Sequence, residues 1–273
     1  MTRLAIIAGQ GNLPLQVARA AEEHGYDVVI FPIEGQADAV FDGFVVQSVR
    51  LGAIGQTQGF LSHHDCRQMV MVGKVSWPSL GELRPDVVGM RLLGKLIKRG
   101  DDSVLRVISR FFAEHGIKTL PVKMFLEGRA MPFRHVAGPD VDDHGQVLIE
   151  IGVSILNKLG PCDVGQSVIV QNGRVLAIEA AEGTSAMLAR SADLIDADSG
   201  LAVFVKMQKS GQDHRLDTPF VGAETMRAAA AAGINILAIE SGAVMLADDL
   251  QKLADICEEH GMSFVGIAPT ADT

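Results

Sequence analysis

Two short, uninterrupted apolar runs near the start of the chain, separated by a helical pattern, most constrain what it can fold into. The runs cover residues 4–8 and 28–31, the second within a predicted strand over 27–31, and between them apolar residues recur at helical spacing over 15–23. Strands that are apolar throughout are buried on both faces, as in parallel sheets covered by helices. The opening therefore predicts a βαβ unit, and 29 Gly beside one Trp and one Tyr also favour an α/β fold.

Turn-forming residues gather near the middle of the chain, which has 273 residues and is long for a single core. Between Met131 and Gly145 the periodicity stops, and Pro, Gly and Asp accumulate as they do in linkers. We predict a Rossmann-like N-terminal domain with a parallel sheet over 1–131 and a linker over 132–145. A C-terminal α/β domain with mixed strand directions follows over 146–273.

Local patterns predict the remaining elements. In the first half we expect strands over 44–48, 68–72 and 118–122 and helices over 85–98 and 103–114. In the second half we expect helices over 147–159, 185–193, 224–232 and 248–260, strands over 201–206 and 263–267, and a strand pair within 234–246. The dipeptide Asn172-Gly173 predicts a tight hairpin within 166–180, because both residues tolerate positive φ angles.

Composition excludes several classes of function. A formal net charge of −9 opposes nucleic-acid binding, which depends on Lys and Arg. The three cysteines are far apart and form neither a disulfide framework nor a zinc knuckle. The first apolar run is too short for a signal peptide or a membrane span. We expect a cytoplasmic protein without a transmembrane segment and without a nucleic-acid partner.

The glycine turn over 8–14 joins the first strand to the first helix. Backbone N–H groups and the helix dipole can receive a phosphate at such a place. Pro14 stands where a dinucleotide fingerprint needs a third glycine, although Glu34 would suit a ribose hydroxyl. Phosphate contact and a purely conformational role of the glycines both remain open.

Three small polar clusters have structural interpretations beside functional ones. His63-His64-Asp65 suggests a metal site, but adjacent side chains point in different directions, so a solvated surface is favoured. Asp101 and Asp102 stand at a predicted helix start, where they suit a helix cap and a hard cation equally. Cys66 lacks the second signature of a cysteine hydrolase, and we interpret it as a structural thiol.

The most unusual segment, residues 206–225, gathers cations, carboxylates, Gly and Pro between a strand and a helix. Sites of α/β proteins occupy this place, at the carboxyl end of a strand. Cations neutralise phosphate oxygens there, while a carboxylate holds Mg²⁺ or activates water. Diphosphate cleavage and a solvated, salt-bridged loop are the two interpretations. A second polar cluster, Glu179 with residues 182–185, either faces the same cleft or caps the following helix.

Several motifs follow one another along nearly the whole chain. They are IAGQGNLP over 7–14, GKVSWP over 73–78, GDD over 100–102, DVGQSVIV over 163–170, NGRVLAIEAAEGTSAML over 172–188 and QDHRLDTPFVGAET over 212–225. On these motifs the sequence resembles the UDP-2,3-diacylglucosamine pyrophosphatase family. The resemblance implies two α/β domains with a substrate cleft between them and Mg²⁺ as cofactor. It also implies water attack on the sugar-side phosphorus, releasing UMP and 2,3-diacylglucosamine 1-phosphate in lipid A biosynthesis.

The resemblance also implies residue roles. The essential acidic residue of the family's Gln-acid-x-Arg-x-Asp-x-Pro motif matches Asp217, which is implied as catalytic carboxylate or metal ligand, with Asp213 as a second metal ligand. On the chemistry of this segment we predict that Lys206, Lys209 or Arg215 stabilises charge developing on the transferred phosphoryl group. The implied substrate-binding residues are Gly9, Gly11, Asn12, Leu13, Lys74, Asp101, Asp102, Glu182, Gly183, Thr184, Gln212 and Thr225.

The implied substrate is an amphipathic, lipid-linked sugar nucleotide. Such a substrate implies transient contact with the inner membrane surface, and the family implies a homodimer. The chain departs from the family pattern at Trp77 (commonly Arg), Ser185 (commonly Asp) and Ser210-Gly211 (commonly Lys-Pro). The competing class is a non-catalytic lipid- or nucleotide-binding protein, and an NAD(P)-dependent oxidoreductase is a weaker alternative.

Overall fold

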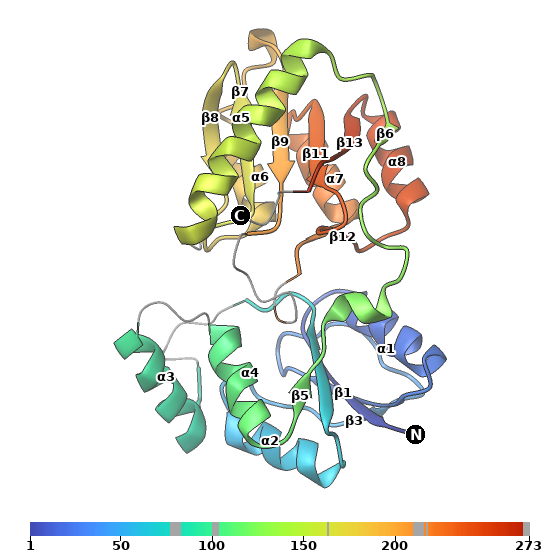
Figure 1. The fold of residues 1–273 in the computed structure, drawn as a ribbon, viewed down its shortest axis with the longest axis vertical. Coiled ribbons are helices and arrows are strands. Elements are labelled where there is room, and N and C mark those ends of the chain that lie inside the picture. Colours follow the sequence, from blue (N-terminus) through green and yellow to red (C-terminus); the bar gives the residue numbers. More distant parts are fainter. Residues whose placement is uncertain (77–82, 100–103, 163, 210–215, 217, 270–273) are drawn as a thin grey trace. The chain divides into compact units, whose positions relative to one another are not determined.

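The computed structural model describes residues 1–76, 83–99, 104–162, 164–209, 216 and 218–269, with the backbone alone for 95–99. These residues form two compact units (Figure 1). Unit 1 comprises Met1–Glu127 together with Leu216, and unit 2 comprises the other described residues from Gly128 onward. Both units are α/β, as the sequence predicts.

Unit 1 is built on a five-stranded parallel sheet with the strand order β3-β2-β1-β4-β5. Its strands are β1 (Arg3–Ala8), β2 (Asp27–Pro32), β3 (Val45–Val46), β4 (Gln68–Val72) and β5 (Lys118–Thr119). Its helices are α1 (Leu13–Glu23), α2 (Ile54–His63), α3 (Val87–Arg99) and α4 (Val104–Glu114), followed after β5 by the 3-10 turn η1 (Val122–Phe125). The predicted βαβ opening is confirmed, and β1 lies at the centre of the sheet.

Burial explains why the first strands stand in the middle of this sheet. Ile6 of β1 and Phe31 of β2 are both fully buried. Helix α1 packs its small face, Val17, Ala18 and Ala21, against the strands, and these residues are fully buried as well. The fixed φ angle of Pro14 suits the first turn of that helix, since no backbone donor is needed there. The carboxyl ends of β1 and β4 are therefore held rigidly beside the start of α1.

Unit 2 is built on a six-stranded mixed sheet with the order β6-β13-β11-β9-β7-β8. Its strands are β6 (His135–Ala137), β7 (Ser167–Gln171), β8 (Arg174–Ile178), β9 (Ala202–Lys206), β11 (Ile236–Glu240) and β13 (Ser263–Ile267). The central strands β9, β11 and β13 are parallel, and the flanking strands β6 and β7 run antiparallel to their neighbours. Two more short strands, β10 (Phe220–Val221) and β12 (Met245–Leu246), pair with each other.

Helices cover both faces of this sheet (Figure 1). The four helices are α5 (Asp143–Leu159), α6 (Thr184–Ser191), α7 (Ala223–Ala232) and α8 (Leu250–Glu259), and the 3-10 turns are η2 (Gly160–Cys162) and η3 (Ala197–Ser199). Leu148 and Leu156 of α5 pack with Val168 and Val205 on one face. Residues of α6, α7 and α8 pack around Phe204 on the other face. The result is a three-layer unit with a continuous apolar core on each side of the sheet.

The structure differs from the sequence predictions in strand pairing and in several elements, and the strand expected over 118–122 is shortened to β5 with the 3-10 turn η1 beginning at Val122. The hairpin at Asn172-Gly173 is confirmed, with φ angles of 52° and 70°, and it joins β7 to β8. The two strands expected to pair within 234–246 do not pair with each other, because β11 lies between β9 and β13 while β12 pairs with β10. Helix α2 and strands β6 and β10 are additional elements that the local patterns did not predict.

Part of the segment expected to be a linker folds onto unit 2 as β6. This strand pairs antiparallel with β13, with Ala137 opposite Phe264. Glycines permit the close approach: a Cβ added to Gly138 would clash with the Met262 carbonyl, and one added to Gly266 would clash with the Pro132 carbonyl. Gly and Pro therefore mark a tight backbone contact here, and α5 begins at once after it.

Candidate functional site

Two loops at the carboxyl ends of β1 and β4 in unit 1 pair with each other through their backbones. The Gln10 amide donates to the Lys74 carbonyl at 2.8 Å, and the Lys74 amide donates to the Gln10 carbonyl at 3.2 Å. A Cβ on Gly9 would lie 2.5 Å from the Lys74 carbonyl oxygen, and one on Gly73 would lie 2.8 Å from the Gly9 carbonyl carbon. The glycines are needed here because two backbones touch, whatever ligand the loops bind.

The turn at the start of α1 is partly filled by a carboxylate of the chain itself. Gly11 has a φ of 89°, and its amide donates to the Asp38 carboxylate at 2.7 Å. A backbone donor at a helix start attracts anions, and Asp38 takes that place here. Gln36 links this turn to the neighbouring loop, since its side chain accepts from the Ser76 amide at 2.9 Å and donates to the Ser76 carbonyl at 3.1 Å. The structure thus brings Gly9, Gly11, Asn12, Leu13 and Lys74 together on adjacent turns, the first four in one turn.

A buried ion pair lies at the ends of three strands in unit 2. The Lys206 ammonium, whose residue is 4% exposed, is 3.6 Å from the Glu179 carboxylate. It donates to the Thr184 hydroxyl at 2.8 Å and to the Ser167 hydroxyl at 3.2 Å. Both hydroxyls in turn donate to Glu179, Ser167 at 2.6 Å and Thr184 at 2.8 Å. Four side chains from different elements therefore form one connected polar network.

The network keeps Glu179 ionised. Burial would raise the pKa of the Glu179 carboxyl, but the Lys206 ammonium and hydrogen bonds from Ser167 and Thr184 outweigh it, and the pKa lies below its ordinary value of 4.5. A carboxyl with a lowered pKa in the folded state stabilises the fold fully above that ordinary value. The contribution is lost as the pH falls through the lower, folded-state pKa.

Glu179→Gln should therefore destabilise the protein at neutral pH and destabilise it less in acid. We expect the variant to unfold at a lower temperature than the unaltered protein at pH 7, with a gap that shrinks as the pH falls below 4.5. Thermal unfolding followed by circular dichroism between pH 7 and pH 3 measures this. Glu259→Gln, an exposed change at the end of α8, is the matched control. A gap of constant size across the range would contradict the assignment.

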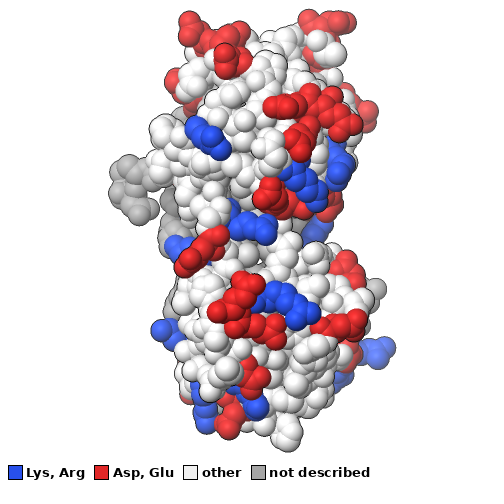
Figure 2. All heavy atoms as spheres, turned by 90° about the vertical axis from the view of Figure 1, so that its right-hand side faces the viewer, with Lys and Arg blue, Asp and Glu red and all other residues white. Residues whose placement is uncertain are grey.

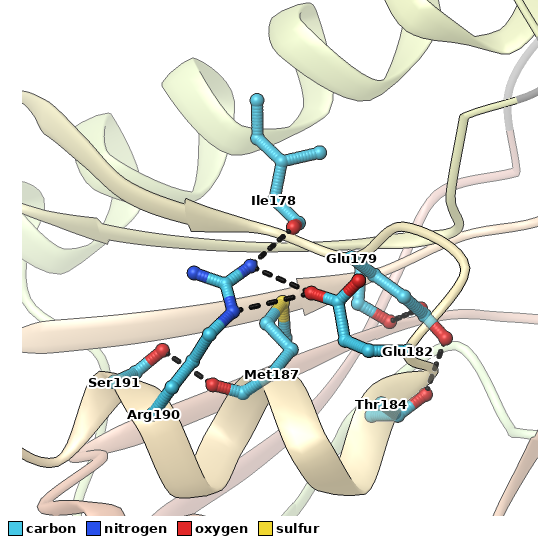
Figure 3. A network of polar contacts seen from close by, with 8 residues as sticks. Ile178, Glu179, Glu182, Thr184, Met187, Arg190 and Ser191 are labelled. Atoms are coloured by element: carbon cyan, nitrogen blue, oxygen red, sulfur yellow. Dashed lines mark hydrogen bonds and ion pairs between the residues drawn. The ribbon is translucent and has the colours of Figure 1, made fainter.

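The loop between β8 and α6 is also held by contacts from Arg190 (Figure 3). Arg190 donates to the Glu182 carboxylate from Nη2 at 2.8 Å and from Nε at 3.1 Å, and to the Ile178 carbonyl at 2.8 Å. The hydrogen bond from Arg190 lowers the pKa of Glu182. Gly183, at the N-cap position of α6, has a φ of 79°. Glu182, Gly183 and Thr184 are thus fixed at the first turn of α6.

The first turn of α7 lies beside that of α6. The Ser185 hydroxyl donates to the Glu224 carboxylate at 3.5 Å, which links the two helix starts. The Ala223 amide donates to the Asp248 carboxylate at 2.8 Å, and Lys252 also contacts Asp248 at 2.6 Å. Thr225, half-buried, stands in the same first turn of α7. Two helix starts and the end of β9 thus converge within unit 2.

A buried carboxylate fixes the exit from β9. Glu240 ends β11, is 3% exposed and accepts from the Gln208 amide at 2.7 Å. Ile239 pairs with Lys206 in the sheet, so Glu240 follows the same edge. The chain leaving this edge leads into residues 210–215, which lie outside the described residues together with Trp77, Asp101, Asp102 and Asp217. The predicted residues Gln212, Asp213, Arg215 and Asp217 are therefore without a structural description.

On the face shown in Figure 2, basic and acidic side chains both appear in each unit, and acidic side chains gather at the top of the picture. Among the described residues, His, Cys, Asp and Glu nowhere gather in a group of three that could hold a metal ion. The metal ligands suggested by the sequence, Asp213 and Asp217 with the alternative pair Asp101 and Asp102, lie outside the described residues.

Comparison with known proteins decides the family. Residues 3–129 match the LpxI N-terminal domain, and residues 135–265 match the LpxI C-terminal domain. The chain belongs to the LpxI family. The UDP-2,3-diacylglucosamine pyrophosphatase LpxI of Caulobacter vibrioides is 30% identical over 277 residues, which cover 98% of this chain and 99% of that protein. The family resemblance seen in the motifs is confirmed, and the likeness to this LpxI runs end to end.

Sequence reasoning did not single out Asp38, Ser167 or Glu240. The last two carry a signal, since a lone polar residue begins the apolar run of β7 and a lone Glu ends that of β11. A polar side chain buried at a strand end needs a partner, which points to a network at the sheet edge. Asp38 carries no such signal, because its partner is a backbone amide 27 residues away.

Proposed function

We propose that this LpxI family member hydrolyses the diphosphate of UDP-2,3-diacylglucosamine, giving UMP and 2,3-diacylglucosamine 1-phosphate as a step of lipid A biosynthesis. The observation that carries the proposal is the end-to-end similarity to a protein named for this activity, at 30% identity over 98% of the chain. Both LpxI domains are matched, so the chain has the parts that a site built from either domain needs.

In the proposed reaction, a water oxygen bonds to the sugar-side phosphorus. The bond from that phosphorus to the bridging oxygen breaks, UMP leaves with this oxygen, and the proton of the water passes to a base or to solvent. Asp217 orients the water or holds Mg²⁺ with Asp213, since carboxylate oxygens suit this hard cation. When bound, Mg²⁺ supplies neutralisation of the diphosphate charge. Arg215 stabilises charge on the transferred phosphoryl group.

The described residues support phosphate and sugar contacts at two places. Loop 9–13 places the start of α1 and the Lys74 cation at the carboxyl edge of the unit 1 sheet, beside the Gly11 amide that donates to Asp38. Residues 182–184 and Thr225 stand at helix starts, where the helix dipole favours anions. We propose that these groups bind the nucleotide and phosphate parts of the substrate.

The proposed setting is the cytoplasm, with transient contact to the inner membrane surface where the lipid substrate resides, and the proposed assembly is a homodimer. No helix in the described ranges combines the length and the apolar character needed to cross a bilayer. Access to a membrane-borne substrate is thus proposed to occur from the surface.

The deciding assay is release of UMP from UDP-2,3-diacylglucosamine by the purified protein, with Mg²⁺ and with EDTA. We expect turnover that needs the divalent ion, and in ¹⁸O-labelled water we expect the label in 2,3-diacylglucosamine 1-phosphate. Label in UMP would refute attack on the sugar-side phosphorus. Stoichiometric substrate binding without product would favour the alternative, a lipid- or nucleotide-binding protein.

A further inference from the structure

We propose that Glu179 is a positioning residue for the pyrophosphatase reaction, acting with Lys206 to hold the Thr184 hydroxyl and the first turn of α6 in place. The inference rests on the proposed function, and it gives Lys206 a positioning role beside the charge-stabilising role expected from the sequence. The Lys206 ammonium contacts Ser167, Glu179 and Thr184 of the same unit.

The first step is that the network fixes the direction of one hydroxyl. Thr184 Oγ1 accepts from Lys206 Nζ at 2.8 Å and donates to Glu179 Oε1 at 2.8 Å. A hydroxyl with a defined donor and a defined acceptor has little rotational freedom. Because Thr184 is the first residue of α6, fixing its side chain fixes the start of that helix.

The second step is that the Glu179–Lys206 pair connects the start of α6 to the edge of the sheet. Ser167 begins β7, Lys206 ends β9, and Glu179 follows β8. Ser167 and Lys206 lie opposite each other in the antiparallel pair of β7 and β9. Thr184, the first residue of α6, is bonded to this corner through Glu179 and Lys206. The network therefore anchors the helix start to the sheet edge.

The third step is that burying an ion pair at this position carries a free-energy penalty that an apolar pair would not. Removing two charges from water carries a large penalty, and apolar side chains of similar size are often as stabilising or more so. Ile169 and Phe204, which lie on the same face two residues along each strand, are fully buried, so an apolar pair would continue the core. We infer that the ion pair contributes more to the orientation of the side chains around it than to the stability of the fold, because a fully hydrogen-bonded network rigidifies its members.

The fourth step is that the surrounding loop is built for rigidity. Arg190 ties Glu182 to the Ile178 carbonyl on the outer side (Figure 3). A Cβ added to Gly165 would clash with the Glu179 carbonyl, so backbone packs tightly behind the carboxylate. The loop 179–183 is thus held on both sides, and Glu179 is its inner support.

The test measures UMP release by the full-length protein with Mg²⁺ for Glu179→Gln, Lys206→Gln, the double variant, Thr184→Val and Thr184→Ser. Glu259→Gln, an exposed change at the end of α8 in the same unit, is the matched control. A misplaced site costs about 10²-fold in rate, so we expect kcat of Glu179→Gln to fall about that much while KM changes little. We expect Thr184→Val to lose activity similarly, and Thr184→Ser, which keeps the hydroxyl, to restore it.

A double variant that loses less than the two single losses combined would support coupling of Glu179 and Lys206. Thermal unfolding is recorded for every variant. If Glu179→Gln lowers the unfolding temperature but leaves kcat unchanged, the pair is only structural and the proposal is overturned. Should Glu179→Gln fail to fold, equal kcat in Thr184→Val and Thr184→Ser overturns it instead. Absence of UMP release by the unaltered protein is a distinct result, which refutes the proposed function itself.

Discussion

Asp217→Asn should abolish UMP release, lowering kcat by about 10³-fold or more, as removal of a central catalytic group does. Asn keeps the size of the side chain and removes the charge that a metal ion or an attacking water needs. We expect the substrate to bind still, because the contacts proposed for loop 9–13, Lys74 and residues 182–184 are intact in this variant. Initial rates of UMP formation at saturating substrate measure the effect.

Asp255→Asn is the matched control, since it makes the same chemical change on the exposed face of α8. It should leave kcat within about twofold, as exposed substitutions far from a site usually do. Retention of a tenth or more of the activity by Asp217→Asn would remove this residue from the centre of the mechanism. A pH profile of the unaltered protein then indicates which other carboxyl or imidazole group acts.

Local sequence patterns predicted the element types because burial imposes them residue by residue. Strand β2 is apolar and buried from Val28 to Phe31, and the Asn172-Gly173 turn has the positive φ angles that those residues tolerate. Helix α2 escaped prediction because its helical pattern is weak: it holds two glycines, and its buried face is only Thr57 and Leu61.

Pairing and networks could not be predicted because they depend on contacts distant in sequence. Strand β12 pairs with β10 across more than twenty residues, and no local pattern distinguishes that from pairing with β11. The same limit holds at the candidate site. Lys206 was singled out for its charge, but its bond to Thr184, 22 residues away, follows only from the order of β7, β8 and β9.

Gly9→Ala should destabilise unit 1 and weaken substrate binding together. The added Cβ would lie 2.5 Å from the Lys74 carbonyl oxygen and 2.9 Å from the Gly73 carbonyl carbon, both backbone atoms that cannot rotate away. Overpacking of this kind costs about 1–3 kcal/mol. We expect a lower unfolding temperature, and a higher KM because relief of the clash moves loop 9–13 away from Lys74.

Gly59→Ala is the matched control, because it makes the same substitution in unit 1 where no atom lies within 4 Å of the added Cβ. Gly59 lies inside α2, and Ala there should raise stability by about 0.5–1 kcal/mol through its helix propensity. Thermal unfolding and KM for UMP release, measured for both variants, separate the effects. Opposite shifts in unfolding temperature, with KM raised only for Gly9→Ala, would assign Gly9 to the backbone contact between the two loops. Equal unfolding temperatures of the two variants would mean that the two loops can separate without loss of stability. Gly9 would then matter for ligand binding alone.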